Sequence, residues 1–255
     1  MTTSTTLKNN KLLVFLSAIF WIFIWQIASI IIGEDLLLVS PYTVLKTLLL
    51  LMRDSTFWSS VLSSFVRIVG GFMLALAAGI SLACISARVR IIEILLSPFM
   101  LTVRTVPVAS FIVLALMWLR SAKNLAVLIS FMMVLPIIYT GVLQGIKNTD
   151  IKLRELAKVY NMSRIKRVLY IFAPQIMPHF VSACTVSLGL CWKSGVAAEV
   201  IGITSNSIGG AIYTAKLLFA TDEVFAWTIV IVLISVAFEK LVLMGIDKLQ
   251  ARWFV

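Results

Sequence analysis

Long apolar stretches occupy most of this 255-residue chain and limit what it can fold into. A helix that crosses a bilayer needs roughly 20 mainly apolar residues, and six stretches meet this need: 12–32, 62–86, 91–118, 124–144, 169–192 and 225–246. Hydrophobic residues make up 61% of the chain and charged residues only 13%, too few for the surface of a soluble domain of this size. The sequence therefore predicts one all-α, polytopic transmembrane domain over 1–255, with 12–32 as the first span and 62–246 as the core spans.

The third apolar stretch, 91–118, contains Arg104-Thr105-Val106-Pro107 and is expected to be broken or kinked there. Proline has no backbone N–H to donate, and its ring clashes with the preceding helical turn. The stretch 41–52 is apolar on average but short, and Lys46 interrupts it. We expect this stretch to form a helix at the outer interface of the membrane rather than a further span.

Residue types that carry catalysis or bind metals are scarce in this chain. The three cysteines, Cys84, Cys184 and Cys191, lie in apolar runs without a Cys-x-x-Cys spacing, which argues against a disulfide framework or a zinc site. The single histidine, His179, is expected to pack rather than to bind a ligand. The sequence holds no Gly-x-x-x-x-Gly-Lys-[Ser/Thr] phosphate-binding loop. We expect no cofactor and no enzymatic activity, and any ATP that drives this chain would bind another subunit.

Lysine and arginine outnumber aspartate and glutamate by 22 to 11, which gives a net charge of +11. These cations lie mainly in short loops between spans rather than on a polar domain, so nucleic-acid binding is not expected. With the N-terminus inside, thirteen of them fall in cytoplasmic segments, six in outer segments and three within or at the ends of spans. Because short cytoplasmic loops are enriched in positive charge, both termini and the 150–168 loop are predicted to be cytoplasmic.

The most specific pattern in the sequence starts in the 150–168 loop and extends into the stretch that follows it. Glu155-Leu156-Ala157 is followed after three residues by Asn161, and after nine more by Ile171-Phe172-Ala173-Pro174. This spacing resembles the cytoplasmic coupling loop of ABC-importer permeases: Glu-x-Ala, three residues, Gly, nine residues, Ile-x-Leu-Pro. Asn161 stands where the family usually has Gly, and Ala173 where it has Leu. The first difference is mild, because Asn is the residue after Gly that best tolerates the left-handed conformation at a helix end.

Residues 152–160 of this loop can form a short amphipathic helix. Asn161 would end that helix and Ser163 would cap the next one, so the loop is shaped as a helix-turn-helix that fits a groove on a second protein. The resemblance implies that the second protein, the partner, is an ATPase. It also implies that six residues of this chain couple to that ATPase: Glu155, Leu156, Ala157, Val159, Tyr160 and Asn161. The Ala157 methyl would let the partner approach closely, and Glu155 would pair with a partner cation. The alternative is a solvated basic loop that touches anionic membrane lipid.

Further elements resemble the nitrate, sulfonate and taurine branch of the same family. They are Ser64-x-x-Arg67-x-x-x-Gly71, Arg104-Thr105-Val106-Pro107 and Trp192-Lys193-Ser194-Gly195-Val196-Ala197-Ala198-Glu199, with Ser207-Ile208-Gly209 following. The resemblance implies a type I ABC-importer permease fold in a bacterial inner membrane, assembled as a homodimer with two ATP-binding subunits and an extracytoplasmic substrate-binding protein. It also implies ATP-driven alternating access for a nitrate-, sulfonate-, taurine- or vitamin-precursor-like solute.

Five residues are candidates for the translocation pathway: Arg104, Pro107, Ser110, Trp192 and Glu199. An intramembrane charge is costly and usually faces a cavity or a partner. Arg104 can line the pathway, where it would attract an anion, or tie the broken helix to carbonyls or to a neighbouring acid. Glu199 can line the outer gate or pair with Arg104 or Lys193. A self-contained secondary carrier or channel, with Arg104 and Glu199 as gating charges, is the alternative to the importer.

Overall fold

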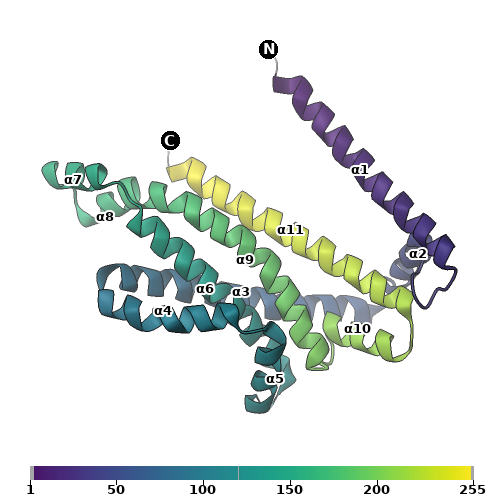
Figure 1. Ribbon diagram of the computed structural model, residues 1–255. Helices are drawn as coiled ribbons and strands as arrows, with labels where there is room; N and C mark the ends of the chain where they lie inside the picture. The colour runs from purple at the N-terminus through teal and green to yellow at the C-terminus, as the bar shows by residue number, and fades with distance from the viewer. Residues whose placement is uncertain (1–2, 120, 254–255) are drawn as a thin grey trace. The chain divides into compact units, whose positions relative to one another are not determined.

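The protein is helical throughout the computed structural model, which describes residues 3–119 and 121–253 (Figure 1). Its α-helices are α1 (Thr3–Ile32), α2 (Pro41–Leu51), α3 (Ser55–Arg88), α4 (Arg90–Thr105), α5 (Val108–Trp118), α6 (Leu125–Lys147), α7 (Ile151–Val159), α8 (Arg164–Arg167), α9 (Ala173–Ile201), α10 (Ile208–Leu217) and α11 (Thr221–Trp253). A 3₁₀ turn at Ala122–Asn124 precedes α6, and a π-helical turn at Val168–Phe172 joins α8 to α9. No strand occurs among the described residues, which confirms the predicted all-α fold class. The extreme ends of the chain, to which the predicted cytoplasmic location refers, lie outside the described residues.

Five helical segments are long and apolar enough to cross a membrane: Phe15–Ile32, Ser55–Arg88, Ala122–Lys147, Arg164–Ile201 and Thr221–Lys248. The bent pair of α4 and α5 meets the same test when its two helices are taken together. These six segments correspond to the six predicted spans, and α2 confirms the predicted short helix. The helices α3 and α11 extend beyond the apolar stretches. Their ends carry polar residues, which can remain helical outside the hydrocarbon of the membrane.

The predicted break in the third span lies between α4 and α5. The helix α4 ends at Thr105, Val106 is extended with φ −69° and ψ 132°, and Pro107 directly precedes the first residue of α5. The ring of a proline disfavours the helical conformation in the residue before it, so Val106 leaves the helix. The two helices are bent by 106° relative to each other.

Together, α4 and α5 follow α6 along its length. At the C-terminal end of α6, Lys147 forms an ion pair with Glu93 in the first turn of α4. At the N-terminal end of α6, Leu125 lies in a buried cluster with Ile112 and Ala115 of α5. Figure 1 shows α4 beside α6. Counted as one broken span, this pair brings the number of candidate membrane-crossing segments from five to six.

The described chain forms two compact units. The first comprises the residues up to Trp58 together with Ala211–Val230. Within it, Phe57 stacks on Trp227 with ring centroids 4.8 Å apart, and the Thr47 hydroxyl donates a hydrogen bond of 2.7 Å to Asp222. The second unit comprises Ser59–Gly210 and the residues from Ile231 onwards, and it holds the sites described below.

The helices α6 and α9 form the centre of the second unit and pack closely. A Cβ atom on Gly141 of α6 would lie 2.6 Å from the Cβ atom of Ala183 on α9. The helix α3 approaches α6 in the same way, because a Cβ atom on Gly71 would lie 2.5 Å from the carbonyl oxygen of Val127. Small residues at such contacts let membrane helices pack backbone to backbone. Here they bring α3 and α9 close to α6.

Candidate functional site

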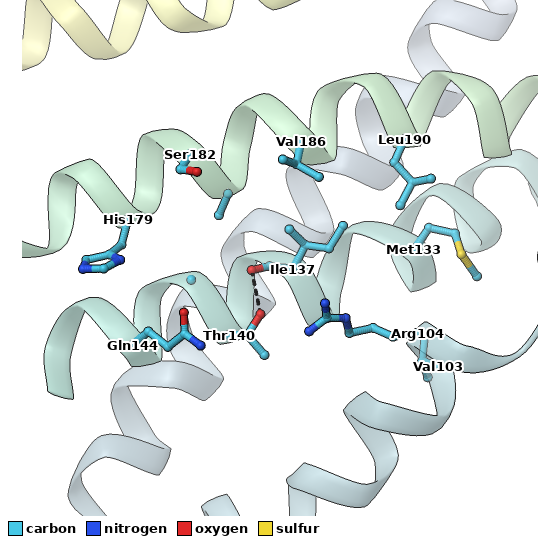
Figure 2. A pocket seen from close by; sticks show the side chains of 12 residues that line it. Val103, Arg104, Met133, Ile137, Thr140, Gln144, His179, Ser182, Val186 and Leu190 are labelled. Atoms are coloured by element: carbon cyan, nitrogen blue, oxygen red, sulfur yellow. Dashed lines mark hydrogen bonds between the residues drawn. The ribbon is translucent and has the colours of Figure 1, made fainter. Parts of the chain in front are cut away.

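A cavity of about 430 Å³ lies between α4, α6 and α9 (Figure 2). Its lining residues are Val103 and Arg104 from α4, Met133, Ile137, Thr140, Gly141 and Gln144 from α6, and His179, Ser182, Ala183, Val186 and Leu190 from α9. Small-molecule sites commonly enclose about 300–1,000 Å³, with mainly apolar walls and a few polar groups. The cavity therefore has the size and the mixed lining of a site for a small polar solute.

Arg104 provides the permanent charge in this cavity. It lies in the last turn of α4, immediately before the break, and its guanidinium extends towards α6 in Figure 2. The side chain is exposed and makes no hydrogen bond or ion pair with any residue that the structure describes. A structural tie would need a carbonyl or an acid as its partner, so the geometry favours a lining role for Arg104.

Four polar side chains share the cavity with Arg104, and the sequence reasoning missed them. Thr140 and Gln144 come from α6, whereas His179, expected to pack, and Ser182 come from α9. Each pair is spaced by three or four residues, which places its members on one face of a helix. The sequence feature that could have identified them was polar residues at helical spacing inside an apolar span. The sequence did not show that these two faces meet.

The other four predicted pathway residues lie away from the cavity. Pro107 and Ser110 are exposed around the start of α5, beyond the break. Trp192 is 1% exposed and packs edge-on against Phe238, with ring centroids 6.3 Å apart. Glu199 is fully buried. Of the five residues predicted to line the pathway, Arg104 lines this cavity and the other four do not.

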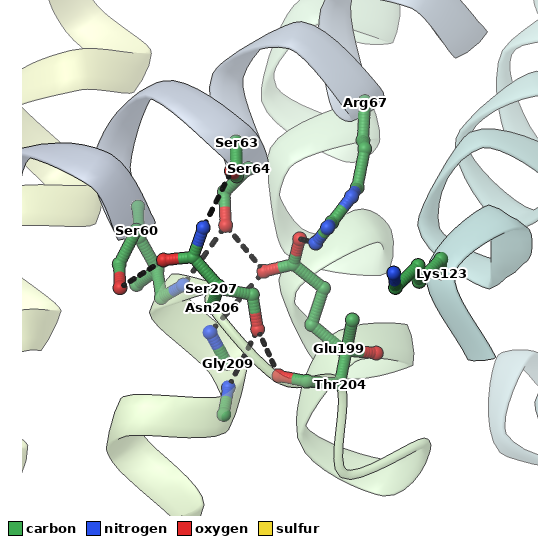
Figure 3. Close-up of polar contacts among 12 residues, drawn as sticks. Ser60, Ser63, Ser64, Arg67, Lys123, Glu199, Thr204, Asn206, Ser207 and Gly209 are labelled. Carbon is green, nitrogen blue, oxygen red and sulfur yellow. Dashed lines mark hydrogen bonds and ion pairs between the residues drawn. The ribbon is translucent and has the colours of Figure 1, made fainter. Parts of the chain in front are cut away.

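Glu199 lies at the centre of a buried polar cluster (Figure 3). Its Oε2 atom accepts a hydrogen bond of 2.7 Å from the Ser64 hydroxyl and one of 3.2 Å from the backbone N–H of Gly209. Its Oε1 atom lies 3.6 Å from Nη1 of Arg67. The Ser64 Oγ atom also accepts the backbone N–H of Ile208 at 2.9 Å. The carboxylate and the serine thus satisfy N–H groups in the first turn of α10, which have no partner within the helix.

These contacts make Glu199 a point at which three helices are joined. Ser64 and Arg67 belong to α3, Glu199 belongs to α9, and the N–H groups belong to α10. The predicted pairing of Glu199 with Arg104 or Lys193 is wrong, because α3 presents the cation to this part of α9. The spacing Ser64-x-x-Arg67 places both side chains on one face of α3, one turn apart.

The predicted coupling helix is α7, which begins and ends one residue earlier than the expected 152–160. The Asp150 carboxylate caps it by accepting a hydrogen bond of 2.9 Å from the N–H of Lys152. As predicted, Ser163 caps the following helix, α8, where its hydroxyl accepts from the N–H of Lys166 at 3.4 Å. The segment from α7 to α8 is hereafter the α7–α8 hairpin, residues 150–167.

The turn of the hairpin is a Schellman motif. Asn161 is left-handed, with φ 46°, as its place in the sequence pattern predicted. The N–H of Met162 donates to the carbonyl of Ala157, and the N–H of Asn161 donates to the carbonyl of Lys158, both at 3.0 Å. This pair of hydrogen bonds defines the motif. Asn161 here performs the task for which other sequences use glycine.

The apolar residues predicted to couple to a partner differ in their exposure. Leu156, Val159 and Tyr160 are 51%, 78% and 73% exposed. Ala157 is 0% exposed, so its methyl does not face a partner as predicted. Ala157 lies at the position of the Schellman motif whose carbonyl accepts the N–H of Met162, a position where an apolar residue commonly packs inward. Of the predicted apolar coupling residues, Leu156, Val159 and Tyr160 are the ones that a partner can touch.

Glu155 lies at a second cavity, of about 330 Å³, on the side of α7 that faces the chain. The residues that share this cavity with Glu155 are Ile151, Arg154, Lys158, Arg167 and Phe172. Three cations of the same chain therefore lie around the carboxylate. None of these cations forms an ion pair with Glu155 among the described residues, and the pairing of Glu155 with a partner cation stays a prediction.

The fold and the site together define a class of protein. Six apolar spans, a cavity of mixed polarity and a capped helical hairpin that joins two of the cavity-lining helices are features of the membrane-spanning subunits of transport systems. Residues 71–254 match the family described as binding-protein-dependent transport system inner membrane component, and the chain belongs to this family. It is accordingly a multi-pass inner membrane protein and a component of a transporter.

Comparison with known proteins agrees with the predicted branch of the family. The chain is 25% identical over 233 residues to the taurine transport system permease protein TauC of Escherichia coli, covering 89% of this chain and 83% of that protein. It is 24% identical over 231 residues to the putative aliphatic sulfonates transport permease protein SsuC of Bacillus subtilis, covering 90% and 83%. It is 24% identical over 256 residues to the nitrate import permease protein NrtB of Synechococcus elongatus, covering 88% and 92%.

Proposed function

We propose that this chain is the transmembrane subunit of an ATP-driven importer and that its α7–α8 hairpin receives the movement of a partner ATPase. The observation that carries this proposal is the position of the hairpin. It joins α6 to α9, and these two helices supply ten of the twelve residues that line the cavity. A partner that displaces the hairpin acts directly on the cavity walls. The partners that we propose are two copies of the ATP-binding subunit, a second copy of this chain and an extracytoplasmic substrate-binding protein.

The hairpin is connected to both helices so that it moves with them. At its start, the N–H of Asp150 donates a hydrogen bond of 2.8 Å to the Gln175 side chain of α9. At its end, the N–H of Ala173 donates to the carbonyl of Val168 in the π-helical turn, where Pro174 supplies no N–H of its own. In the proposed cycle, ATP closes the ATPase subunits, the hairpin follows, the cavity opens outward, and hydrolysis reverses the change.

We propose that the hairpin and both ends of the chain lie in the cytoplasm. An even number of crossings places both ends on one side, and the excess of lysine and arginine assigns that side to the cytoplasm. Single cysteines at Asp150 and Asp222, in a background without the native cysteines, test the assignment. An impermeant thiol reagent added outside should modify the Asp222 site and spare the Asp150 site. Modification of the Asp150 site from outside would exclude this orientation.

Docking of the ATPase is tested on the exposed apolar face of α7. Val159→Asp places a charge on that face, and it should reduce the amount of ATPase that co-purifies with the tagged chain. Val89→Asp is the matched control, because Val89 is also an exposed valine and lies in the α3–α4 connection on the same side of the membrane. Equal recovery of ATPase with both variants would contradict docking on α7. A chain that co-purifies with no ATPase and transports without ATP would be a secondary carrier or channel.

We further propose that the transported solute is a small anion. Arg104 gives the cavity a positive charge, and relatives of this chain are named for taurine, aliphatic sulfonates and nitrate. The neighbouring amide, imidazole and hydroxyl groups can donate hydrogen bonds to anionic oxygens. An arginine that has no acid beside it is well suited to a carboxylate, sulfonate or nitrate group.

The role of Arg104 is tested by uptake of labelled taurine, alkanesulfonate and nitrate, expressed per assembled complex. Arg104→Lys keeps the charge but loses the planar fork and should retain part of the uptake. Arg104→Gln should lose most of it, while assembly with the ATPase and ATP hydrolysis continue. Arg90→Gln, in the first turn of the same helix and outside the cavity lining, is the control. Equal uptake by wild type and Arg104→Gln, at equal abundance, would remove the anion-attraction hypothesis.

A further inference from the structure

A further cavity, of about 210 Å³, lies where three spans end beside the α7–α8 hairpin. Arg88 contributes to it from the last turn of α3, Ile146 from the last turn of α6, and Ile176 from the first turn of α9. Because these apolar helices reach the membrane surface at their ends, the cavity lies at the depth of the lipid headgroups. The proposed transport cycle does not use it.

Two arginines line this cavity, and no acidic residue of the described chain lines it with them. Arg88 alone would be explained by its position, because a cation at the end of a helix interacts favourably with the helix dipole. Arg154 comes from a different element, α7, and its guanidinium lies 5.5 Å from the centroid of the Phe172 ring. Arg154 also lines the cavity that holds Glu155, but neither Arg88 nor Arg154 forms an ion pair with an acidic residue that the structure describes. The two guanidinium groups, which come from separate elements, therefore leave a positive charge that an anion can balance.

We propose that an anionic phospholipid of the adjoining leaflet occupies this cavity, with its phosphate between Arg88 and Arg154 and its acyl chains along Val168 and Ile176. Charge complementarity accounts for the phosphate. The apolar walls account for the acyl chains, and a soluble anion would make no use of them. Basic pockets between transmembrane helices at the membrane surface bind lipid headgroups in this manner. The lipid joins α3 to the hairpin, so it holds the side of α7 that is turned away from the proposed ATPase surface.

Cys84 provides a reporter for this site. It lines the cavity and is exposed, whereas Cys184 and Cys191 are buried. The full-length protein is reconstituted in bilayers of phosphatidylcholine, with or without phosphatidylglycerol of the same acyl chains. The rate at which an uncharged maleimide modifies Cys84 is then measured, since an uncharged reagent is not itself attracted or repelled by the lipid charge. We expect phosphatidylglycerol to slow the modification severalfold.

Substitution of the arginines tests whether the protection comes from this site. A cation near an anionic lipid surface contributes about 1 kcal/mol, so Arg88→Gln and Arg154→Gln should each raise the phosphatidylglycerol content needed for half-maximal protection about fivefold. The double variant should show a larger shift than either single variant. Arg90→Gln is the matched control: Arg90 lies two residues from Arg88 but does not line the cavity, so its replacement should leave protection unchanged.

Several results would overturn the proposal. They are equal modification rates in the two bilayers, protection that survives in the double variant, and protection that Arg90→Gln removes as effectively as Arg88→Gln. Protection by inorganic phosphate in bilayers of phosphatidylcholine alone would assign the site to a soluble anion and would equally overturn the lipid proposal. The experiment contains no ATPase, so its failure leaves the importer proposal standing, and a failure of ATPase co-purification leaves the lipid site standing.

Discussion

Removal of the Glu199 carboxylate should destabilise the folded protein strongly, because three groups depend on it. In Glu199→Ala, the Ser64 hydroxyl and the Gly209 N–H lose their acceptor, and Arg67 keeps its charge on a side chain that is 18% exposed. Removing one member of a buried pair costs about 3–5 kcal/mol, because the remaining charge is left without compensation. The lost pairing with Arg67, at 3.6 Å, and the two donors left without an acceptor contribute together to this cost. We expect a loss of about 3–5 kcal/mol in the free energy of unfolding.

The assay is reversible unfolding of the purified protein in mixed micelles, with Glu93→Ala as the matched control. Glu93 also pairs with a cation, Lys147, but their side chains are 29% and 49% exposed. A pair in such a position contributes at most about 1 kcal/mol. Glu199→Gln keeps an oxygen acceptor without the charge and should lie between the two, at about 1–2 kcal/mol.

Two outcomes would refute this reasoning. If Glu199→Ala unfolds no more easily than Glu93→Ala, the cluster does not join the three helices in the way that the hydrogen bonds indicate. If Glu199→Gln is as stable as the wild type but loses uptake, Glu199 acts in the pathway and the stability argument assigns it the wrong role. A transport defect that scales with lost stability would instead support the structural role.

Three further substitutions test the packing and the hairpin. Gly71→Leu should destabilise the protein by about 1–3 kcal/mol through overpacking, whereas Gly70→Leu should be tolerated, because a Cβ atom there meets nothing within 4 Å; thermal unfolding of both variants compares them. Ala157→Trp should make the hairpin of the permease alone sensitive to protease, because the methyl is buried within the chain; a protease-resistant hairpin that fails only to bind ATPase would contradict this. Asn161→Ala should loosen the turn by about 1 kcal/mol, because a left-handed conformation is unfavourable for L-residues, while Asn161→Gly should not, and limited proteolysis would rank the variants.

The parts of the fold that depend on local chemistry could be predicted from the sequence. The break in the third span followed from one proline, and the structure places it between Thr105 and Val108, around Pro107. The end of α7 followed from Asn161, which is left-handed as expected. Both features arise within a few residues of their cause. Apolar length likewise requires no knowledge of neighbours. Each of the six predicted stretches is helical, five as long apolar helices and the third as the bent pair of α4 and α5, and only their ends differed.

Contacts between distant segments could not be predicted in this way. The partner of Glu199 is Arg67 on another helix, and its choice depends on which face of α3 meets α9. The sequence pattern of one helix shows which residues share a face of that helix. It does not show how the helix is rotated relative to its neighbours. The burial of Ala157 was not predicted, because its spacing to Glu155 matches a known motif and we therefore interpreted its methyl as a contact for a partner. The polar cavity was missed because Gln144 and Ser182 are unremarkable when each is considered alone.

Arg104 and Glu199 show what distinguishes a charge that lines a cavity from one that joins helices to each other. Both lie in apolar spans, and the sequence suggested the same role for both. Glu199 is fully buried, with two hydrogen-bond donors and a cation around it. Arg104 is exposed to a cavity and has no partner in the described chain. A charge whose interactions are satisfied within the fold has little left to offer a passing solute, whereas an unpaired charge gains from one. Substitutions of Glu199 should therefore affect stability first, and substitutions of Arg104 should affect uptake first.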